Sequence, residues 1–295
     1  MRRGVWSAIV AYLIWWLFPI YWKLLHGVPP LQLLSHRVIW SCLLLAAIVS
    51  VTRDWRSFLS ETATWRVRFI YLAAALLIGL NWFVYVWAVN AGHVVESSLG
   101  YFINPLISVV LGVLVLKERL RPGQWAAVAL AAAGVVYFTV SVGSLPWIAL
   151  TLATTFALYG LVKKVAPLGS VHGLALETGM LFLPTVAYLA WISHQGSGAF
   201  PSGTVNDALL IGAGVVTTVP LLLFASAAKT IPLYWIGLFQ YVNPTIQFLL
   251  GVYVYGEVLS VERLVGFSIV WTALAVFIIE GLLVHRPWAL PATAE

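Results

Sequence analysis

Charged and protonatable side chains inside long apolar segments are the residues of this sequence whose chemistry most needs an explanation. His36 and Arg37 lie five or six residues into the apolar run 31–52, and Glu96 lies near the start of the run 94–116. A charge at the centre of hydrocarbon costs about 2.5–3.5 kcal/mol on insertion scales, so such groups should face a protein interior or a wet cavity. An Arg37–Glu96 pair is geometrically possible. The alternatives are that Arg37 extends to the membrane interface and that His36 is a hydrogen-bonded packing residue.

Two Asn-Pro pairs, beginning at Asn104 and Asn243, lie near the middle of apolar segments. Proline has no amide hydrogen, so the carbonyls of Tyr101 and Gln240, four residues earlier, lose their helical partners. Side chains or water must satisfy these carbonyls inside the protein or beside a cavity. We expect two bends that flank a central cavity; the alternative is a packing kink that never touches a solute.

Further polar residues fall at helical spacings that bring them to the same region. Asn81 and Tyr85 are one turn apart in the segment 67–89, and we expect both to line the cavity with Trp82. Large cavities for small solutes are mostly apolar, with a few polar groups that fix orientation. The candidate solute-binding residues are therefore His36, Arg37, Asn81, Trp82, Tyr85, Glu96, Tyr101, Asn104, Gln240 and Asn243.

Glu177 occupies the position equivalent to His36 when the chain is shifted by 141 residues against itself. With Lys163 or Lys164 it would form a mirrored cluster on the opposite side of the membrane, although we favour an ion pair at the interface. We interpret Glu118 and Glu257 as interfacial too, because both lie at the ends of apolar runs beside loops.

Patterns typical of enzymes are missing from the sequence. The six histidines are scattered without zinc-like spacing, no Gly-rich phosphate loop with its lysine occurs, and no nucleophilic triad stands out. We therefore expect no catalytic residues, no metal and no cofactor. The net charge of +6 does not indicate nucleic-acid binding, because the basic residues cluster beside apolar segments.

The elements that position these residues are predicted to be membrane-spanning helices. Of the 295 residues, 62% are apolar and only 9% are charged, against about 25% charged in soluble domains. A hydrocarbon core of ~30 Å needs roughly 20 helical residues. We predict an all-α integral membrane protein with ten spans, near residues 4–24, 31–52, 67–89, 94–116, 122–142, 145–163, 170–193, 207–228, 232–256 and 260–283.

The distribution of Lys and Arg predicts the orientation of these spans. With a cytoplasmic N-terminus, thirteen basic residues fall on the inner side and only Lys23 and Arg263 on the outer side. We expect both termini in the cytoplasm, which requires an even number of spans. The Gly/Ser-rich stretch 193–207 is expected to be a flexible outer loop.

An internal repeat divides the chain into two halves. When residues 99–120 are aligned with residues 139 positions later, ten of the 22 aligned positions carry the same amino acid, and the two Asn-Pro pairs align with each other. Each half holds five expected spans, so the second must enter the membrane from the opposite side. We predict two inverted five-helix repeats, residues 1–143 and 144–295, an arrangement in which solute sites lie near the midplane between the halves.

The sequence resembles the RarD proteins of the EamA group, within the drug/metabolite transporter superfamily. The resemblance is carried along almost the whole chain by motifs that include Ser35-His36-Arg37-Val38-Ile39-Trp40-Ser41, Trp87-Ala88-Val89-Asn90, Gly100-Tyr101-Phe102-Ile103-Asn104-Pro105 and Val216-Thr217-Thr218-Val219-Pro220. It implies ten helices in a five-plus-five inverted repeat and a permease of the bacterial inner membrane. One departure is Asn243, where Gly precedes the proline in the family pattern.

These observations predict a secondary transporter that exports small metabolites or drugs by alternating access. Its expected partners are a small-molecule solute, the lipid bilayer and a coupling ion. Protons are slightly favoured over Na⁺ because His36, His93, Glu96 and Glu177 can bind them. The alternative is a membrane-embedded enzyme or a receptor that transports nothing.

Overall fold

The structure, a computed structural model, describes residues 2–16, 21, 24–25, 27–90, 94–142, 147–240 and 261–283, and these residues form helices joined by short connections. No strand occurs in these ranges. The helices are α1 (Arg2–Trp16), α3 (Pro30–Val51), α4 (Trp55–Glu61), α5 (Trp65–Asn90), α6 (Val94–Leu114), α7 (Pro122–Val142), α8 (Trp147–Val165), α9 (Ser170–His194), α10 (Thr204–Thr230), α11 (Leu233–Gln240) and α13 (Val261–Leu283).

Six of these helices, namely α3, α5, α7, α8, α9 and α10, are long and apolar enough to cross a membrane. Shorter apolar stretches lie in α1, α6 and α13. From the start of α3 to the end of α10, the helix ends fall within three residues of the expected spans, the largest difference being Thr204 against 207. The short helix α4 was not expected, and residues 241–256 of the ninth expected span lie outside the described residues.

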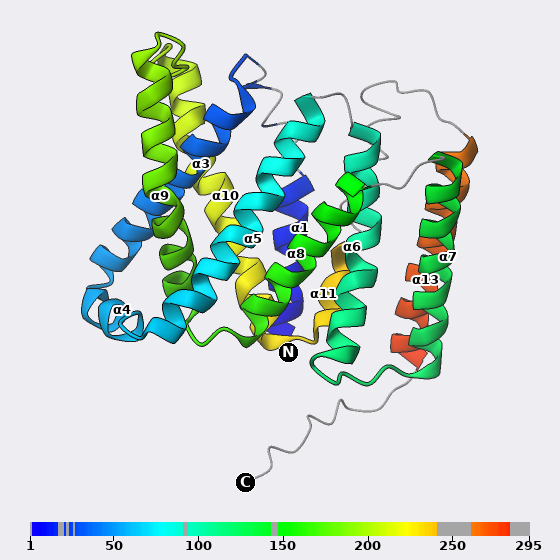
Figure 1. The fold of residues 1–295 in the computed structure, drawn as a ribbon. Coiled ribbons are helices and arrows are strands. Elements are labelled where there is room, and N and C mark those ends of the chain that lie inside the picture. The colour runs from blue at the N-terminus through cyan, green and yellow to red at the C-terminus, as the bar shows by residue number, and fades with distance from the viewer. Residues whose placement is uncertain are drawn as a thin grey trace.

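The long helices run between two ends of one bundle (Figure 1). The start of α1, the end of α13 and the whole of α4 lie at one end, which we term the α4 end. The connection between α9 and α10 lies at the other, which we term the loop end. The two ends of the described chain therefore lie on the same side of the bundle.

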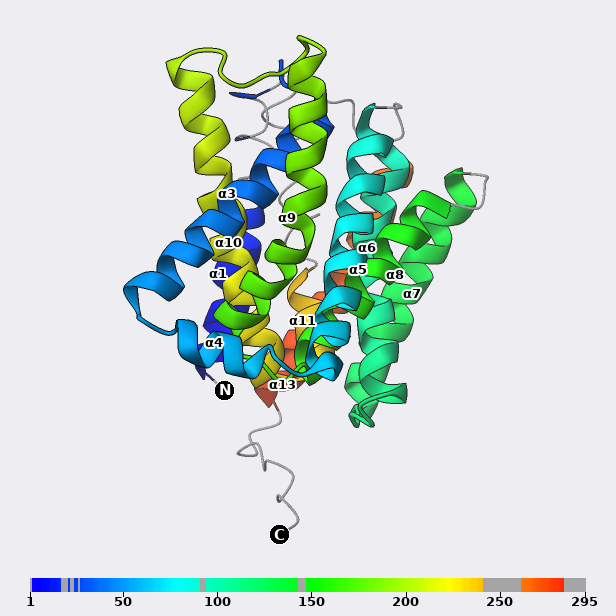
Figure 2. The same cartoon turned by 60° about the vertical axis from the view of Figure 1, so that its left-hand side comes forward.

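The helices pack in a regular set of pairs. Helix α3 lies against α9 and α10, α5 lies against α8 and α9, and α6 lies against α8 and α11. Helix α1 packs on α10, and α7 packs on α13. Figure 2 shows α1, α3, α9 and α10 together on one side and α5, α6, α7 and α8 on the other. The largest core cluster contains many alanines and aromatic rings, with Trp15 of α1 touching Phe156 of α8 and Phe224 of α10.

Glycines allow two of these helix pairs to approach closely. A Cβ at Gly214 of α10 would lie 2.5 Å from the Cβ of Trp40 on α3, and one at Gly237 of α11 would lie 2.8 Å from the carbonyl oxygen of Pro105 on α6. Lipid tails are as apolar as leucine, so helices associate in membranes largely through such close packing. Any side chain at these positions would force the backbones apart.

Exposed tryptophans gather near helix ends. Trp65, Trp125 and Trp147 lie in the first turns of α5, α7 and α8, and Trp191 lies in the last turn of α9, each at least half exposed. Amphipathic rings at these depths are typical of the headgroup region on both sides of a bilayer. The outer surface of the bundle thus suits a membrane.

Candidate functional site

Arg37 lies in the middle of the site, where α3 faces α5 and α10. Its side chain is buried, and its Nε donates a hydrogen bond to Thr217 Oγ1 of α10 at 3.0 Å. The guanidinium carbon lies 4.7 Å from the ring centroid of Trp82 on α5. A planar cation over an indole face is a favourable arrangement, more so where water is excluded. One alternative from the sequence was that Arg37 extends to the membrane interface. Its burial and its hydrogen bond to Thr217 argue against that alternative.

Two tyrosines lie near Arg37 in addition to Trp82. Tyr85 lies one turn beyond Asn81 on α5, Tyr101 lies on α6, and their ring centroids are 6.1 Å apart. Their hydroxyl groups are hydrogen-bonded to each other, and both interact with the charge of Arg37. The structure therefore brings together four predicted site residues, from three helices: Arg37, Trp82, Tyr85 and Tyr101. We term these four the Arg37 cluster.

Two predicted asparagines lie beside this cluster but bind α8. The amide of Asn81 donates to the Leu152 carbonyl at 2.8 Å and to Thr155 Oγ1 at 2.9 Å. The amide of Asn104 donates to the next carbonyl, that of Ala153, at 3.2 Å. Two asparagines, from α5 and α6, thus hold consecutive carbonyls of α8. Hydrogen bonds of this kind join helices in membranes and are worth about 0.6–1.7 kcal/mol each.

The remaining predicted site residues do not join the Arg37 cluster. His36 is buried on α3 and its ring lies 5.3 Å from that of Phe200, in the connection between α9 and α10. Gln240 ends α11 and is buried, and its Oε1 has no hydrogen-bond partner within the described part of the chain. The side chain of Glu96 and all of Asn243 lie outside the described residues, so the expected Arg37–Glu96 pair does too.

Thr217 is the site residue that sequence reasoning missed. It lies in the motif Val216-Thr217-Thr218-Val219-Pro220, which carried the family resemblance but was given no role. Both threonines are buried, and Thr218 Oγ1 has no partner among the described residues. The available signal was a pair of hydroxyl residues followed by proline inside an apolar helix, a combination that leaves polar groups needing partners.

A second buried cluster joins α8 to α9. Lys163 Nζ lies 2.6 Å from Glu177 Oε1, and each side chain is only 1% exposed. The ion pair expected at Glu177 is therefore present, with Lys163 as its partner, and it is enclosed by protein. Lys164 faces elsewhere, donating to the Ile231 carbonyl at 2.6 Å and lying 3.8 Å from Glu118.

Glu118 is not merely an interfacial residue. Its two carboxylate oxygens accept hydrogen bonds from the backbone amides of Leu233 at 2.8 Å and Tyr234 at 3.2 Å. These amides open α11, and the first amides of a helix have no partner within it. A carboxylate is also favoured there by the helix dipole. Glu118, which follows α6, thus fixes the start of α11.

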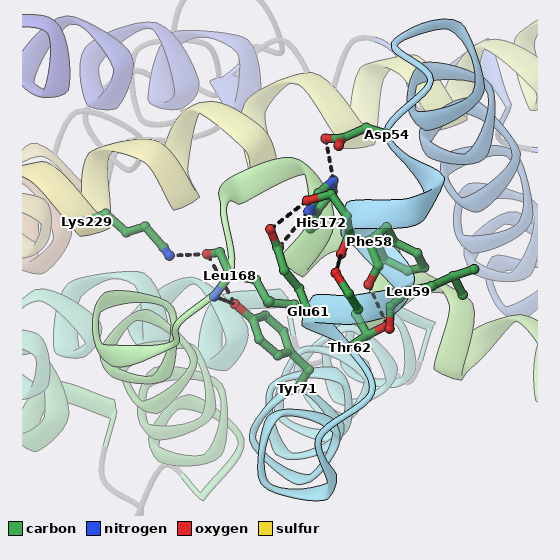
Figure 3. Close-up of polar contacts among 11 residues, drawn as sticks. Asp54, Phe58, Leu59, Glu61, Thr62, Tyr71, Leu168, His172 and Lys229 are labelled. Atoms are coloured by element: carbon green, nitrogen blue, oxygen red, sulfur yellow. Dashed lines mark hydrogen bonds and ion pairs between the residues drawn. The ribbon is translucent and has the colours of Figure 1, made fainter.

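The α4 end is closed by ionic and backbone contacts around His172 (Figure 3). His172 of α9 lies between two carboxylates, with Nε2 2.9 Å from Asp54 and Nδ1 2.8 Å from Glu61. Each ring nitrogen of His172 therefore has a carboxylate partner from the segment around α4. The hydrogen bond to His172, followed by one from Ser57, lowers the pKa of Glu61 below its usual value.

The same end holds a second contact layer at the connection between α8 and α9. Tyr71 of α5 accepts a hydrogen bond from the Leu168 amide at 3.0 Å, and Lys229 of α10 donates to the carbonyls of Ala166 and Leu168. Figure 3 shows Lys229 and Tyr71 meeting at Leu168, with the α4 contacts beside them. Helices α4, α5, α9 and α10 are thereby joined at this end.

A bundle of apolar, membrane-length helices around buried charged residues defines a multi-pass membrane protein, and comparisons with known proteins give the family. The sequence model of the EamA-like transporter family matches residues 2–140. The chain is 44% identical to Protein RarD of Escherichia coli, over 97% of each chain. It is 45% identical to an uncharacterized transporter of Vibrio cholerae, over 95% of this chain and 93% of that protein.

Two further matches complete the comparison. The chain is 29% identical, over 92% of each chain, to the Chloramphenicol-sensitive protein RarD of Pseudomonas aeruginosa. A solved crystal structure superposes with a TM-score of 0.70 and covers 96% of this chain and 99% of its own; its 19% identity shows a shared fold alone. The protein therefore belongs to the EamA-like transporter family, with RarD proteins among its relatives, and it is a multi-pass membrane protein.

Proposed function

We propose that this protein is a secondary transporter that exports small metabolites or drugs across the bacterial inner membrane. One observation carries the proposal. Arg37, from the expected first half of the chain, is buried and hydrogen-bonded to Thr217, from the expected second half. A buried ionisable residue inside a membrane bundle marks a functional site by default, because its cost must be offset by a task.

The chemistry of the Arg37 cluster indicates the kind of solute. A guanidinium group offers a fork of donors that matches a carboxylate or a phosphate. Trp82, Tyr85 and Tyr101 supply aromatic surface and two hydroxyl groups around it. Pockets of mostly apolar lining with a few polar groups bind small organic molecules. The cluster therefore favours a small anionic or zwitterionic solute with an apolar or aromatic part.

Alternating access needs two halves that can rock about the site, and several features support two inverted repeats. The pairing of α1 with α10 has a counterpart in the pairing of α8 with α5. Equivalent helices, such as α3 and α9, run in opposite directions along the bundle (Figure 1). The family match spans residues 2–140, close to the length of the first expected repeat. We place the division near residue 143.

The orientation that we propose puts the α4 end in the cytoplasm. Arg53, Arg56, Arg66 and Arg68 surround α4, and Lys117, Arg119 and Arg121 precede α7 at the same end. Basic residues are enriched in cytoplasmic loops. Both termini are then cytoplasmic, and the contacts around His172 and Lys229 close the inner side of the transporter. The loop end faces outward.

Reconstitution into liposomes tests the proposed function. Purified protein would be assayed with radiolabelled amino acids, nucleosides and aromatic drugs, and with chloramphenicol because a relative is named for sensitivity to it. We expect at least one solute to exchange across the membrane faster than in empty liposomes, and inside-out vesicles to accumulate it. If no member of the panel moves faster than in empty liposomes under imposed pH or Na⁺ gradients, the proposal loses its support.

A further inference from the structure

The buried pair Lys163–Glu177 carries a second inference, which rests on the proposed function. Glu177 lies two turns into α9, and its Oε1 receives Lys163 Nζ of α8 at 2.6 Å. Its other oxygen accepts a hydrogen bond from the hydroxyl group of Tyr159, also on α8, at 3.0 Å. Lys163 and Tyr159 are four residues apart and so project from one face of α8. Both oxygens of the carboxylate are therefore held by donors from one neighbouring helix.

The charged and titratable groups around Glu177 come from five helices, α3, α4, α5, α8 and α10. The ammonium group of Lys163 lies 5.5 Å from the ring centroid of Tyr71 and 5.8 Å from that of Tyr159. Lys229 of α10 interacts with the charge of Lys163, and Glu61 interacts with Tyr71. Cys42 of α3 is hydrogen-bonded to Thr178, the neighbour of Glu177. Lys163 is thus the one group that directly neutralises Glu177 among the residues described.

We propose that Glu177 is the proton-binding site that couples transport to a proton gradient, with Lys163 as the cation that the proton displaces. In the state seen here the carboxylate is paired and the two residues together carry no net charge. Transfer of one proton from a hydronium ion forms an O–H bond on Glu177, breaks one in the hydronium ion, which becomes water, and ends the ion pair. The pair then carries one positive charge, on Lys163.

That positive charge links protonation to the movement of the helices. An unpaired ammonium group is costly in a dry interior, so the proton-loaded protein favours a state in which water or new partners reach Lys163. Tyr71 connects this site to the α4 end, because its ring faces Lys163 and its hydroxyl group binds the backbone of Leu168. Proton binding would therefore loosen the contacts that close the inner side.

A purely structural role is the competing account of this pair. Replacing a buried ion pair with apolar residues of similar size is often neutral or stabilising, so stability alone does not require the charges. If the ion pair had only a structural role, the protein would tolerate the neutral double substitution Glu177→Gln with Lys163→Met. A proton site would lose its response to pH in that protein even though the fold is kept.

Infrared difference spectroscopy tests the proton site without any solute. Spectra of the full-length protein in liposomes would be recorded between high and low pH, looking for the carbonyl stretch of a protonated carboxylic acid. We expect a titrating band that is lost in Glu177→Gln. Glu118→Gln is the matched control, because Glu118 also faces a lysine at the same end of the bundle and is held by backbone amides. That variant should keep the band.

Tyr159→Phe is a second variant that still tests the proposal if Glu177→Gln fails to fold. It removes one hydrogen bond to the Glu177 carboxyl group and leaves the carboxyl in place. The carbonyl stretch should then move to higher frequency, while Tyr188→Phe, in the outer half of α9, leaves it unchanged. A titrating band that is unaltered in both Glu177→Gln and Tyr159→Phe would overturn the proposal.

A transport measurement then separates the failure of this inference from the failure of the proposed function. With a solute identified in the liposome screen, Glu177→Gln should exchange labelled for unlabelled solute within about twofold of the wild-type rate, yet lose at least tenfold of the accumulation driven by a pH gradient. Gradient-driven accumulation at the wild-type level in Glu177→Gln would refute the coupling site and leave transport itself established. Absence of transport by the wild type would instead refute the proposed function, whatever the infrared band shows.

Discussion

Arg37 and Thr217 are 180 residues apart in the chain, yet Nε of the first lies 3.0 Å from Oγ1 of the second. The contact joins α3 to α10 close to where Gly214 lets the two helices approach. A charged residue in this position is buried on one side by Trp82 and held on the other by a hydroxyl group. Any solute that competes for the guanidinium group must therefore disturb the packing between the two halves that we propose.

The His172 contact makes a prediction about local stability at the α4 end. In His172→Phe, α4 loses its two ionic contacts to α9, so its backbone amides should exchange with deuterium a few-fold faster. That magnitude follows from partly exposed ion pairs, which are worth about 0.2–1 kcal/mol each. The matched control is His194→Phe, at the exposed opposite end of α9. Equal exchange rates of residues 55–61 in the two variants would show that the His172 contact does not stabilise α4.

The lowered pKa of Glu61 sets the pH range of the same contact. The hydrogen bond to His172 favours the ionised carboxylate in the folded state, so the stabilisation is present above the ordinary pKa of glutamate, 4.5, and is lost as the pH falls through the lowered value. Deuterium exchange of α4, corrected for the intrinsic effect of pH, should rise as the pH falls below about 4.5. Glu61→Gln should already show the faster exchange at pH 7.

The close approach of α3 and α10 predicts a large difference between two glycine substitutions. Gly214→Ala places a methyl group 2.5 Å from the Cβ and 2.6 Å from the carbonyl carbon of Trp40, so backbone must move. Overpacking of this kind typically costs 1–3 kcal/mol, or ~2 kcal/mol here, which should appear as a lower thermal midpoint in detergent. Gly179→Ala on α9 meets nothing within 4 Å and is the control. If both variants melt like the wild type, the crossing is looser than described.

Orientation is predicted to place α4 in the cytoplasm and the connection between α9 and α10 outside. Ser60 and Ser202 are both exposed serines, one at each end of the bundle. In a Cys42→Ser background, a membrane-impermeant maleimide should label Ser202→Cys in right-side-out vesicles and label Ser60→Cys only after the membrane is opened. The reverse pattern would invert the topology.

Sequence reasoning predicted the described helices well because apolar length is a strong signal in a bilayer. A stretch such as 30–51 must span or be buried, and its ends follow from where charged and turn residues begin. Helix α4 was missed because it has only seven residues, four of which are charged or polar, so it gives no such signal. The family motifs were equally informative, and the relatives with RarD names bear out that resemblance.

Side-chain partners were harder to predict than helices. Four of the ten candidate residues form the Arg37 cluster, because their helical spacing fixed the face on which each one lies. Asn81 and Asn104 were expected to line a cavity, but their amides bind carbonyls of α8, a choice that depends on which helix packs beside them. The role of Thr217 depends on its contact with Arg37, 180 residues away in the sequence. The burial of Lys163 depends on enclosure by other helices. No local sequence pattern encodes either feature.

The most direct test of the account compares two arginine variants in the same liposomes. Arg37→Gln removes the charge from the proposed solute site, whereas Arg121→Gln removes one that pairs with Glu280, where α7 packs on α13. For an anionic or zwitterionic solute found in the liposome screen, we measure the initial rate of exchange with equal amounts of folded protein. Loss of a charge-assisted contact of about 1.5–3 kcal/mol predicts a reduction of roughly tenfold or more in Arg37→Gln and a near wild-type rate in Arg121→Gln. Equal rates in the two variants would contradict the central claim that solute binds at Arg37.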